Sequence, residues 1–479
     1  MNIAIILFTL GRVIAIESAF MVLPGIVSLI YQESNWWIYF TVALVGMLLG
    51  LLVSYKKPKN TQFFAKEGFA SVGLAWFLIS LTGAIPPFLS REIPNYIDAV
   101  FEMSSGFTTT GATILTDVEA MTHATLFWRS FSHWIGGMGI VVFLLAVMPM
   151  VGGVNMHLLR AESPGPIVGK LVPKMKDSSQ ILYFIYIVLT LVQIISLKLM
   201  GMTLFEAVCT SCATAGTGGF GVYNSSIADF STLIKWNVTI FMILYGVNFN
   251  VYFLIIARKF KGIFKIEEVR TYLIAIAVSI CIITLNILKM YDSFGNALTD
   301  AAFQVASIIT TTGFATTDFN LWPSLSKTIL ILLMVCGACA GSTGGGLKFS
   351  RVLIVIKAVK QEINSFIHPR SVKAVGMDDR TVDKAVVKSV CVYIILFALI
   401  YFGSVFIVSI DKYDMVTNFT AVLATMNNIG PGLEAVGPTG NFAGFNYLSK
   451  IVFIFDMLAG RLELYPILLL FIPPMWKKH

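Results

Sequence analysis

The feature that most constrains this chain is a short stretch rich in glycine and threonine that occurs four times. The clearest copy is Ser105-Gly-Phe-Thr-Thr-Thr-Gly-Ala112, and degraded copies stand at 214–220, 310–315 and 426–431. Each copy follows an apolar segment of about 12 residues, which as a helix is about 18 Å long and cannot span about 30 Å of hydrocarbon. Internal repetition of this kind predicts four equivalent structural units.

The repeated stretches are candidates for the lining of an ion path. Irregular backbone cannot face lipid, because its polar groups would lack partners, but it is tolerated beside a water-filled path, where carbonyls can replace an ion's hydration shell. Glycine also permits the dihedral angles that turn successive carbonyls to one side. Four such strips around one axis would form a cation selectivity filter, and the alternative is a set of glycine-rich turns between helices. The candidate ion-coordinating residues are Thr109, Thr110, Gly111, Thr217, Gly218, Gly219, Thr311, Thr312, Gly313, Asn428, Ile429 and Gly430.

An acidic residue precedes the shared glycine by thirteen positions in three of the four copies: Asp98, Glu206 and Asp300. In the fourth copy the same offset falls on Thr417. These acids stand where the short helices begin, and a negative charge suits the positive end of a helix dipole. They are candidate outer-mouth acids that attract cations, and a capping role is the alternative or an addition.

The composition places the chain among all-α polytopic membrane proteins, since 57% of its 479 residues are hydrophobic and 13% are charged. The net charge of +8 gathers in loops between hydrophobic segments, at residues such as Lys57, Arg160, Lys259 and Arg370, so it indicates orientation and not nucleic-acid binding. The positive-inside rule then predicts cytoplasmic termini, outward-facing glycine strips and ten full crossings.

We expect two N-terminal transmembrane helices in residues 1–58, followed by four helix–pore-loop–helix repeats. The expected repeats span 59–165, 166–263, 264–370 and 371–479. Each should contain a full helix, a short half-helix that ends in the glycine strip, and a second full helix. The expected second helices span 125–150, 232–258, 326–361 and 447–472.

The second helix of the third repeat is interrupted by consecutive small residues, which predicts an intramembrane break beside a cavity or another part of the protein. The interrupting residues are Gly341, Ser342, Thr343, Gly344, Gly345 and Gly346. A flexible linker is the alternative.

Arg461 lies within the final hydrophobic helix, where a cation facing the path would raise the barrier to ion passage. Pairing of Arg461 with Asp456 or Glu463 is the competing interpretation.

Several other polar residues receive no functional role. Arg12 and Glu17 lie within the first helix and stay unassigned. The pairs Cys209/Cys212 and Cys336/Cys339 lack further cysteine or histidine ligands nearby, so they are interpreted as small packing residues.

The segment from Arg129 through His133-Trp-Ile-Gly-Gly-Met-Gly-Ile140, together with Asn428-Ile-Gly-Pro-Gly432, resembles the Trk/Ktr/HKT superfamily of potassium transporters. The two additional N-terminal helices resemble the bacterial Trk subclass, the TrkH-like membrane subunits. The resemblance implies potassium uptake through one pore of fourfold pseudosymmetry, with backbone carbonyls coordinating K⁺, and with Rb⁺ and Na⁺ as further candidate ions. It also implies that residues 341–346 form a gating loop and that Arg461 faces the pore.

The same resemblance implies a homodimer in the bacterial cytoplasmic (inner) membrane, regulated by a separate TrkA-type ring that binds NAD or ATP. No P-loop signature is present in the sequence, so nucleotide control is expected from another subunit. The expected function is a gated, channel-like potassium permease without a covalently bound cofactor. The alternatives are a symporter coupled to H⁺ or Na⁺ and a less selective K⁺/Na⁺ permease. An enzyme is not expected, because the five histidines are scattered and no catalytic motif accompanies them.

Overall fold

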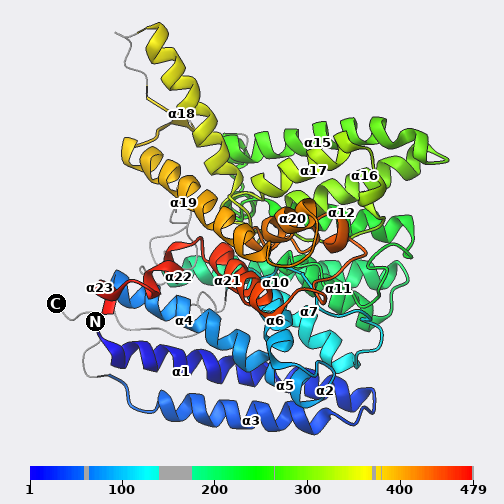
Figure 1. The fold of residues 1–479 in the computed structure, drawn as a ribbon, viewed down its shortest axis with the longest axis vertical. Helices are drawn as coiled ribbons and strands as arrows, with labels where there is room; N and C mark the ends of the chain where they lie inside the picture. The colour runs from blue at the N-terminus through cyan, green and yellow to red at the C-terminus, as the bar shows by residue number, and fades with distance from the viewer. Residues whose placement is uncertain (59–63, 140–174, 264, 369–373, 379, 477–479) are drawn as a thin grey trace.

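Helices dominate the computed structural model, which describes residues 1–58, 64–139, 175–263, 265–368, 374–378 and 380–476. The first two helical segments run side by side along one edge of the molecule (Figure 1). They consist of α1 (Ile3–Phe20) with α2 (Val22–Ile30), and α3 (Trp36–Val53). A Cβ added to Gly11 or Gly50 would lie 2.7 Å or 2.6 Å from a backbone oxygen of the other helix, so these two glycines permit the close packing of α1 on α3.

The rest of the described chain contains four groups of helices in sequence order. The first group is α4 (Ala65–Gly83), α5 (Ile85–Leu89), α6 (Tyr96–Phe107) and α7 (His123–Met138). The second is α10 (Met175–Leu199), α11 (Leu204–Gly216), α12 (Thr232–Gly246) and α13 (Asn250–Ile256). The third is α14 (Phe260–Ile263), α15 (Glu267–Ile287), η1 (Leu288–Met290), α16 (Phe294–Ile309), η2 (Phe319–Leu321), α17 (Ser324–Cys336) and α18 (Phe349–Ile367). The fourth is α19 (Lys384–Val408), α20 (Met415–Met426), η3 (Glu434–Val436), α21 (Tyr447–Arg461), α22 (Tyr465–Leu470) and α23 (Pro473–Trp476).

The two-residue strands β1 (Gly376–Met377) and β2 (Arg380–Thr381) pair antiparallel between α18 and α19. Met377 from this hairpin shares a small hydrophobic cluster with Ile354 of α18 and Val390 of α19. This hairpin was not expected from the sequence. In Figure 1, α18 extends away from the body of the molecule beside α19.

The short helices expected before each glycine strip are α6, α11, α16 and α20, which contain 12, 13, 16 and 12 residues. All of them are largely buried within the protein. Each begins after a residue whose side chain accepts a hydrogen bond from the first turn: Asn95, Thr203, Ser293 and Asp414. These N-caps give each short helix a defined start.

The second helix is interrupted in the second, third and fourth groups. The break in the third group was expected, whereas those in the second and fourth groups correct the expectation of continuous helices. The pair α12 and α13 bends by 96°, while residues 337–348 separate α17 from α18 and residues 462–464 separate α21 from α22. Positive φ angles at Gly337 (68°) and Leu464 (68°) account for two of these breaks, because a helix cannot continue through the left-handed region. Helix α7 ends before Gly139, where φ is 81°, and the expected continuation to residue 150 lies outside the described residues.

Among the described residues, six helices are long and apolar enough to cross a membrane, or seven if the bent α12–α13 pair counts as one span. The interrupted second helices of the groups account for most of the difference from the ten expected crossings. Lys59, Ile140, Arg160, Arg370 and the C-terminal tail 477–479, which supported the sequence-based orientation or family resemblance, lie outside the described residues. The same is true of the expected repeat boundaries at 59, 165–166 and 370–371.

Candidate functional site: the four glycine strips

The four glycine strips share one backbone conformation. The N–H of the residue before the shared glycine donates to the carbonyl oxygen five residues earlier, at 2.8–2.9 Å in all four copies. The residue before that donor has a left-handed backbone, with φ of 58° at Thr109, 56° at Thr217, 59° at Thr311 and 56° at Asn428. This combination is the Schellman motif that ends a helix. The four short helices therefore end in the same way, although their sequences differ.

Three of the left-handed residues are threonines, which is unusual for a β-branched side chain. Conformations of this kind cost about 1–3 kcal/mol each and persist where the surrounding structure enforces them, often at functional sites. Asparagine, which tolerates the left-handed region better, replaces threonine in the fourth copy. The recurrence of the same strained position in four copies indicates that the strip conformation is maintained for a purpose other than stability.

The strips contact one another in a closed cycle. A Cβ added to each shared glycine would meet the carbonyl oxygen of the residue that precedes the glycine of the next strip. The distances are 2.0 Å from Gly111 to Gly218, 2.1 Å from Gly219 to Thr312, 2.1 Å from Gly313 to Ile429, and 2.8 Å from Gly430 back to Thr110. Each glycine also has a positive φ, between 78° and 94°. Each position therefore favours glycine for two reasons, which are its backbone conformation and the close approach of the neighbouring strip.

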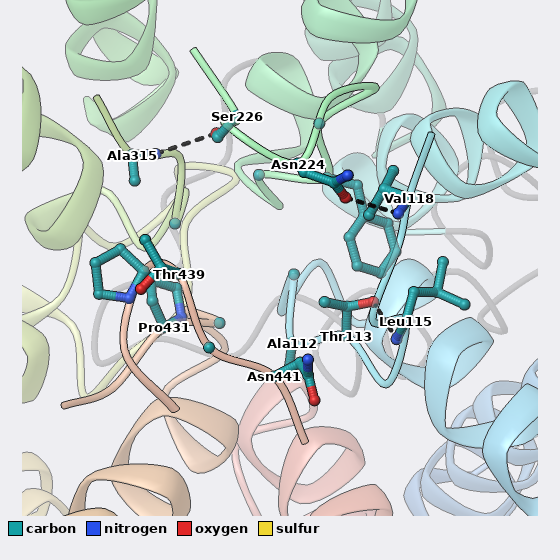
Figure 2. A pocket seen from close by; sticks show the side chains of 18 of the residues that line it. Ala112, Thr113, Leu115, Val118, Asn224, Ser226, Ala315, Pro431, Thr439 and Asn441 are labelled. Atoms are coloured by element: carbon teal, nitrogen blue, oxygen red, sulfur yellow. Dashed lines mark hydrogen bonds between the residues drawn. The ribbon is translucent and has the colours of Figure 1, made fainter. Parts of the chain in front are cut away.

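All four shared glycines line one cavity of about 150 Å³. Loops that follow the four strips complete its wall, and Figure 2 shows Ala112, Asn224, Ala315, Pro431 and Asn441 around it. Arg129 is the one charged residue among those that line the cavity in the described part of the chain. The strips that the sequence analysis singled out are thus brought together at one place.

Hydrogen bonds between the loops hold the rim of this cavity (Figure 2). Val118 N–H donates to Asn224 Oδ1 at 2.8 Å, and Ser226 Oγ accepts from Ala315 N–H at 3.2 Å. The Asn224 side chain also donates to Asp117 Oδ1 at 2.8 Å, and this hydrogen bond lowers the pKa of the Asp117 carboxyl below its usual range. An ionised Asp117 therefore lies next to a residue of the cavity wall, a position that no sequence motif indicated.

His133 is a buried residue that connects the first two strips. Its Nδ1 lies 2.7 Å from the carbonyl oxygen of Gly106, and its Nε2 accepts from Phe220 N–H at 3.2 Å. Because a carbonyl can only accept and an amide N–H can only donate, these partners specify the neutral ring protonated at Nδ1. The ring also fills the space next to Gly218, where a Cβ would lie 2.3 Å from Nδ1. In the sequence, His133 stands out only as part of the segment that resembles the potassium transporters, and its two backbone partners are distant in sequence.

A buried ion pair supports the first strip from behind. Arg129 Nε donates to Glu102 Oε1 at 2.8 Å, and both side chains are almost fully buried. The Glu102 carboxylate also accepts from Thr113 Oγ1 at 2.9 Å and from Ile114 N–H at 3.0 Å, directly after Gly111. The Arg129 guanidinium lies 4.1 Å from the ring centre of Phe220, which follows Gly219. The pair therefore links the backbone after two neighbouring strips.

The three acids thirteen residues before the glycines do not line the cavity in the described structure. Asp98 forms an ion pair with Lys450, with 2.7 Å between Oδ1 and Nζ. Glu206 accepts from the N–H of the N-cap residue Thr203 at 2.7 Å and also from the hydroxyl of Tyr223, while Asp300 accepts from Thr316 Oγ1 at 2.8 Å. Glu206 thus fixes the start of its short helix, Asp300 binds the loop after its strip, and Asp98 links α6 to α21.

The irregular segment 337–348 contacts the opposite ends of the strips, where the short helices finish. Gly345 N–H donates to Thr311 Oγ1 at 2.6 Å. A Cβ added to Gly344 would lie 2.8 Å from the carbonyl oxygen of Thr310, and one added to Gly345 would lie 2.5 Å from that of Asn427. The segment includes the predicted residues 341–346 and is longer than they are. It therefore lies directly against two of the four strips.

Arg461 connects this segment to the end of another helix. Its Nη1 donates to the carbonyl oxygen of Thr343 at 2.8 Å, and its Nη2 donates to the carbonyl oxygens of Gly136 and Gly137, the latter at 2.9 Å. The contacts of Asp456 and Glu463 do not favour the alternative in which they pair with Arg461. Asp456 accepts from Ser404 at 2.7 Å, and Glu463 pairs with Arg351.

The remaining candidates of the sequence analysis lie away from the cavity. Glu17 accepts a hydrogen bond from Thr82 Oγ1 inside the protein, and the Arg12 guanidinium lies 5.4 Å from the ring centre of Phe8. Cys209, Cys212 and Cys339 are buried free thiols. In the part of the chain that the structure describes, no group of three or more metal-ligating side chains occurs.

Comparison with known proteins is consistent with this geometry. A family model described as TrkH, a cation transport protein, matches residues 38–478. The chain is 35% identical over 476 residues to the Trk system potassium uptake protein TrkH of Salmonella typhimurium, with 98% of each chain covered. It is 33% identical over 475 residues to the Trk system potassium uptake protein TrkG of Escherichia coli, covering 98% of this chain and 97% of that relative. The crystal structure of the potassium transporter TrkH from Vibrio parahaemolyticus matches the fold with a TM-score of 0.89 at 30% identity, covering 100% of both chains.

Proposed function

The chain belongs to the TrkH family of cation transport proteins, and we propose that it takes up potassium across the bacterial cytoplasmic membrane through one path lined by the four glycine strips. The observation that carries the proposal is that Gly111, Gly219, Gly313 and Gly430 contact one another's strips in a closed cycle and line one cavity. The relatives that are named potassium uptake proteins, which align with nearly the whole chain, support potassium as the ion.

The proposed filter uses backbone carbonyls in place of an ion's hydration shell. The four short helices end at the strips, and the negative ends of their dipoles favour a cation there. The coordinating residues are those of the sequence analysis: Thr109, Thr110, Gly111, Thr217, Gly218, Gly219, Thr311, Thr312, Gly313, Asn428, Ile429 and Gly430. Four equivalent strips imply four repeats of fourfold pseudosymmetry with the boundaries given above.

Segment 337–348 and Arg461 form the proposed gate. The segment contacts Thr311 and Asn427, which belong to two of the strips, and the Arg461 guanidinium donates to its Thr343 carbonyl. A fixed positive charge at this place raises the barrier to a passing cation. Opening would require that the segment move away from the helix ends and that Arg461 change partners.

Further parts of the proposal concern the surroundings of the path. Asp98, Glu206 and Asp300 would act as outer-mouth acids, with Asp98 partly neutralised by Lys450. We place both termini in the cytoplasm, and we propose a homodimer whose gate is controlled by a separate TrkA-type ring that binds NAD or ATP. The membrane potential would drive uptake, since it supplies about 2.3 kcal/mol per charge per 100 mV.

The test is flux into liposomes that contain the purified protein. A membrane potential is imposed, and there is no gradient of H⁺ or Na⁺. We expect ⁸⁶Rb⁺ to enter under the potential alone, and external K⁺ to compete more strongly than Na⁺. Uptake that requires an H⁺ or Na⁺ gradient would contradict the channel-like mechanism and favour a symporter. Equal competition by K⁺ and Na⁺ would favour the less selective permease.

A further inference from the structure

Glu268 is a buried acid on α15 that holds both flanks of segment 337–348. Its Oε1 accepts from Ala340 N–H at 2.7 Å and from Ser350 N–H at 3.0 Å. Only 4% of the residue is exposed. These amides stand before and after the stretch that contacts the strips, so one carboxylate oxygen joins the two ends of the segment. Hydrogen bonds to a charged acceptor are stronger than those to a neutral one.

The preceding residue, Glu267, contacts α18 and the β1–β2 hairpin. Its carboxylate pairs with Lys357 of α18, and its backbone N–H donates to Asp378 Oδ1 in the β1–β2 hairpin at 2.7 Å. Lys357 Nζ also donates to the carbonyl oxygen of Gly376 at 2.7 Å. Glu267 and Lys357 are partly exposed. This residue is thus tied to the hairpin and to α18.

The two sets of contacts are adjacent on a rigid element. Helix α15 contains 21 residues and packs against α16, α17 and α18. The hairpin itself is attached to α18 and α19 through the cluster of Ile354, Met377 and Val390. A displacement of the hairpin and α18 therefore acts on Glu267, and a rotation or shift of the helix start moves Glu268 with it.

We propose that the Glu267–Glu268 pair at the start of α15 is the mechanical link through which the α18–hairpin surface moves segment 337–348. Glu268 is a positioning residue that holds the segment in its closed conformation, and Asp378 keeps the helix start in place. This inference rests on the proposed function, because the segment affects flux only if it obstructs the ion path. It identifies the hairpin surface as the place where a regulatory partner would act.

The test is hydrogen–deuterium exchange of the full-length protein in lipid nanodiscs, following peptides that cover residues 337–350. Glu268→Ala should raise exchange in these peptides by at least about tenfold, because Ala340 N–H and Ser350 N–H lose their acceptor. Glu268→Gln retains an acceptor oxygen and should keep most of the protection. Asp378→Ala should also raise exchange in 337–350, although Asp378 has no described contact with that segment.

The coupling itself is measured by a double-mutant cycle. Adding Asp378→Ala to Glu268→Ala should give no further increase in 337–350, because the link is already broken. Asp383→Ala is the matched control. Asp383 lies in the same region but caps α19 through Ala385 N–H at 3.1 Å, so its loss should leave exchange in 337–350 unchanged.

Additive effects of Asp378→Ala and Glu268→Ala would overturn the proposal, as would unchanged exchange in Glu268→Ala or an equal effect of Asp383→Ala. In liposomes, Glu268→Ala should raise ⁸⁶Rb⁺ flux at least about threefold with the K⁺/Na⁺ preference retained. If the exchange results are as expected but Glu268→Ala does not change ⁸⁶Rb⁺ flux, the gating role of segment 337–348 is contradicted. Absence of potential-driven ⁸⁶Rb⁺ flux in the unmodified protein would instead contradict the proposed function.

Discussion

Alanine substitutions at Gly219 and Gly430 separate two reasons why a strip needs glycine. Both glycines have a positive φ, 78° and 94°, so an alanine at either position carries a similar backbone penalty of about 1–2 kcal/mol. The space around them differs. A Cβ on Gly219 would lie 2.1 Å from the carbonyl oxygen of Thr312, whereas a Cβ on Gly430 would lie 2.8 Å from that of Thr110.

The required displacement follows from these distances. A Cβ atom rarely approaches another heavy atom closer than 3.0 Å, so the Thr312 carbonyl must move by 0.9 Å (3.0 − 2.1) and the Thr110 carbonyl by 0.2 Å (3.0 − 2.8). Ion preference depends on the positions and field of the coordinating carbonyls. We therefore expect Gly219→Ala to reduce K⁺/Na⁺ discrimination at least about tenfold, which corresponds to about 1.4 kcal/mol. Gly430→Ala should reduce it by less than about threefold.

The assay is competition of K⁺ and Na⁺ with ⁸⁶Rb⁺ uptake in liposomes, normalised to the amount of folded protein. The thermal stability of both variants should fall by a similar amount, since they share the backbone penalty. Equal losses of discrimination would show that backbone strain and not carbonyl displacement governs the effect. Unchanged discrimination in Gly219→Ala would refute the assignment of the strips as the filter.

Three further predictions follow from the contacts around the strips. His133→Ala leaves Phe220 N–H and the Gly106 carbonyl without their partner, so we expect unfolding to become easier by about 2 kcal/mol, measured by thermal denaturation, and K⁺/Na⁺ discrimination to weaken. Glu102→Gln leaves the buried Arg129 charge uncompensated and should cost about 3–5 kcal/mol of stability. The double variant Glu102→Leu with Arg129→Met should recover part of that loss. No recovery would contradict the ion-pair argument. Arg461→Gln should raise basal ⁸⁶Rb⁺ flux without changing ion preference, and a changed preference would place Arg461 in the filter and not in the gate.

Much of the architecture could be predicted from the sequence, because the glycine strips and the short helices before them are local patterns. The spacing of Gly111, Gly219, Gly313 and Gly430 relative to apolar segments correctly indicated four short buried helices that end in irregular backbone. The recurrence of a left-handed threonine two residues before the glycine could not be read from composition, since threonine normally avoids that conformation.

The breaks in the second helices were predicted only where consecutive glycines signalled one. The bend between α12 and α13 follows Gly246, and the Asn248 side chain accepts from Asn250 N–H at 2.9 Å in the turn before α13. A single glycine and an asparagine in an apolar segment are weak signals, because tertiary contacts decide whether they end a helix. The interruption after Arg461 has no glycine at its left-handed residues, Glu463 and Leu464.

Long-range partners were the least predictable part of the site. Arg461 contacts carbonyls more than 100 residues away in sequence, whereas the sequence offered only its local acids Asp456 and Glu463. Asp98 likewise pairs with Lys450, at a separation of 352 residues. Such pairs depend on how the helices pack around the strips, and the period of a hydrophobic pattern does not specify that packing.

The most direct test of the central claim is the position of a heavy monovalent cation in crystals of the protein grown with Rb⁺ or Tl⁺. We predict an anomalous difference peak enclosed by the four strips, within coordinating distance of the carbonyl oxygens of Thr110, Gly218, Thr312 and Ile429. In crystals grown with Na⁺ in place of Rb⁺ or Tl⁺, the same site should be less occupied. A peak elsewhere, or a filter region without any peak while the strips keep their conformation, would contradict the claim that these four strips form the ion path.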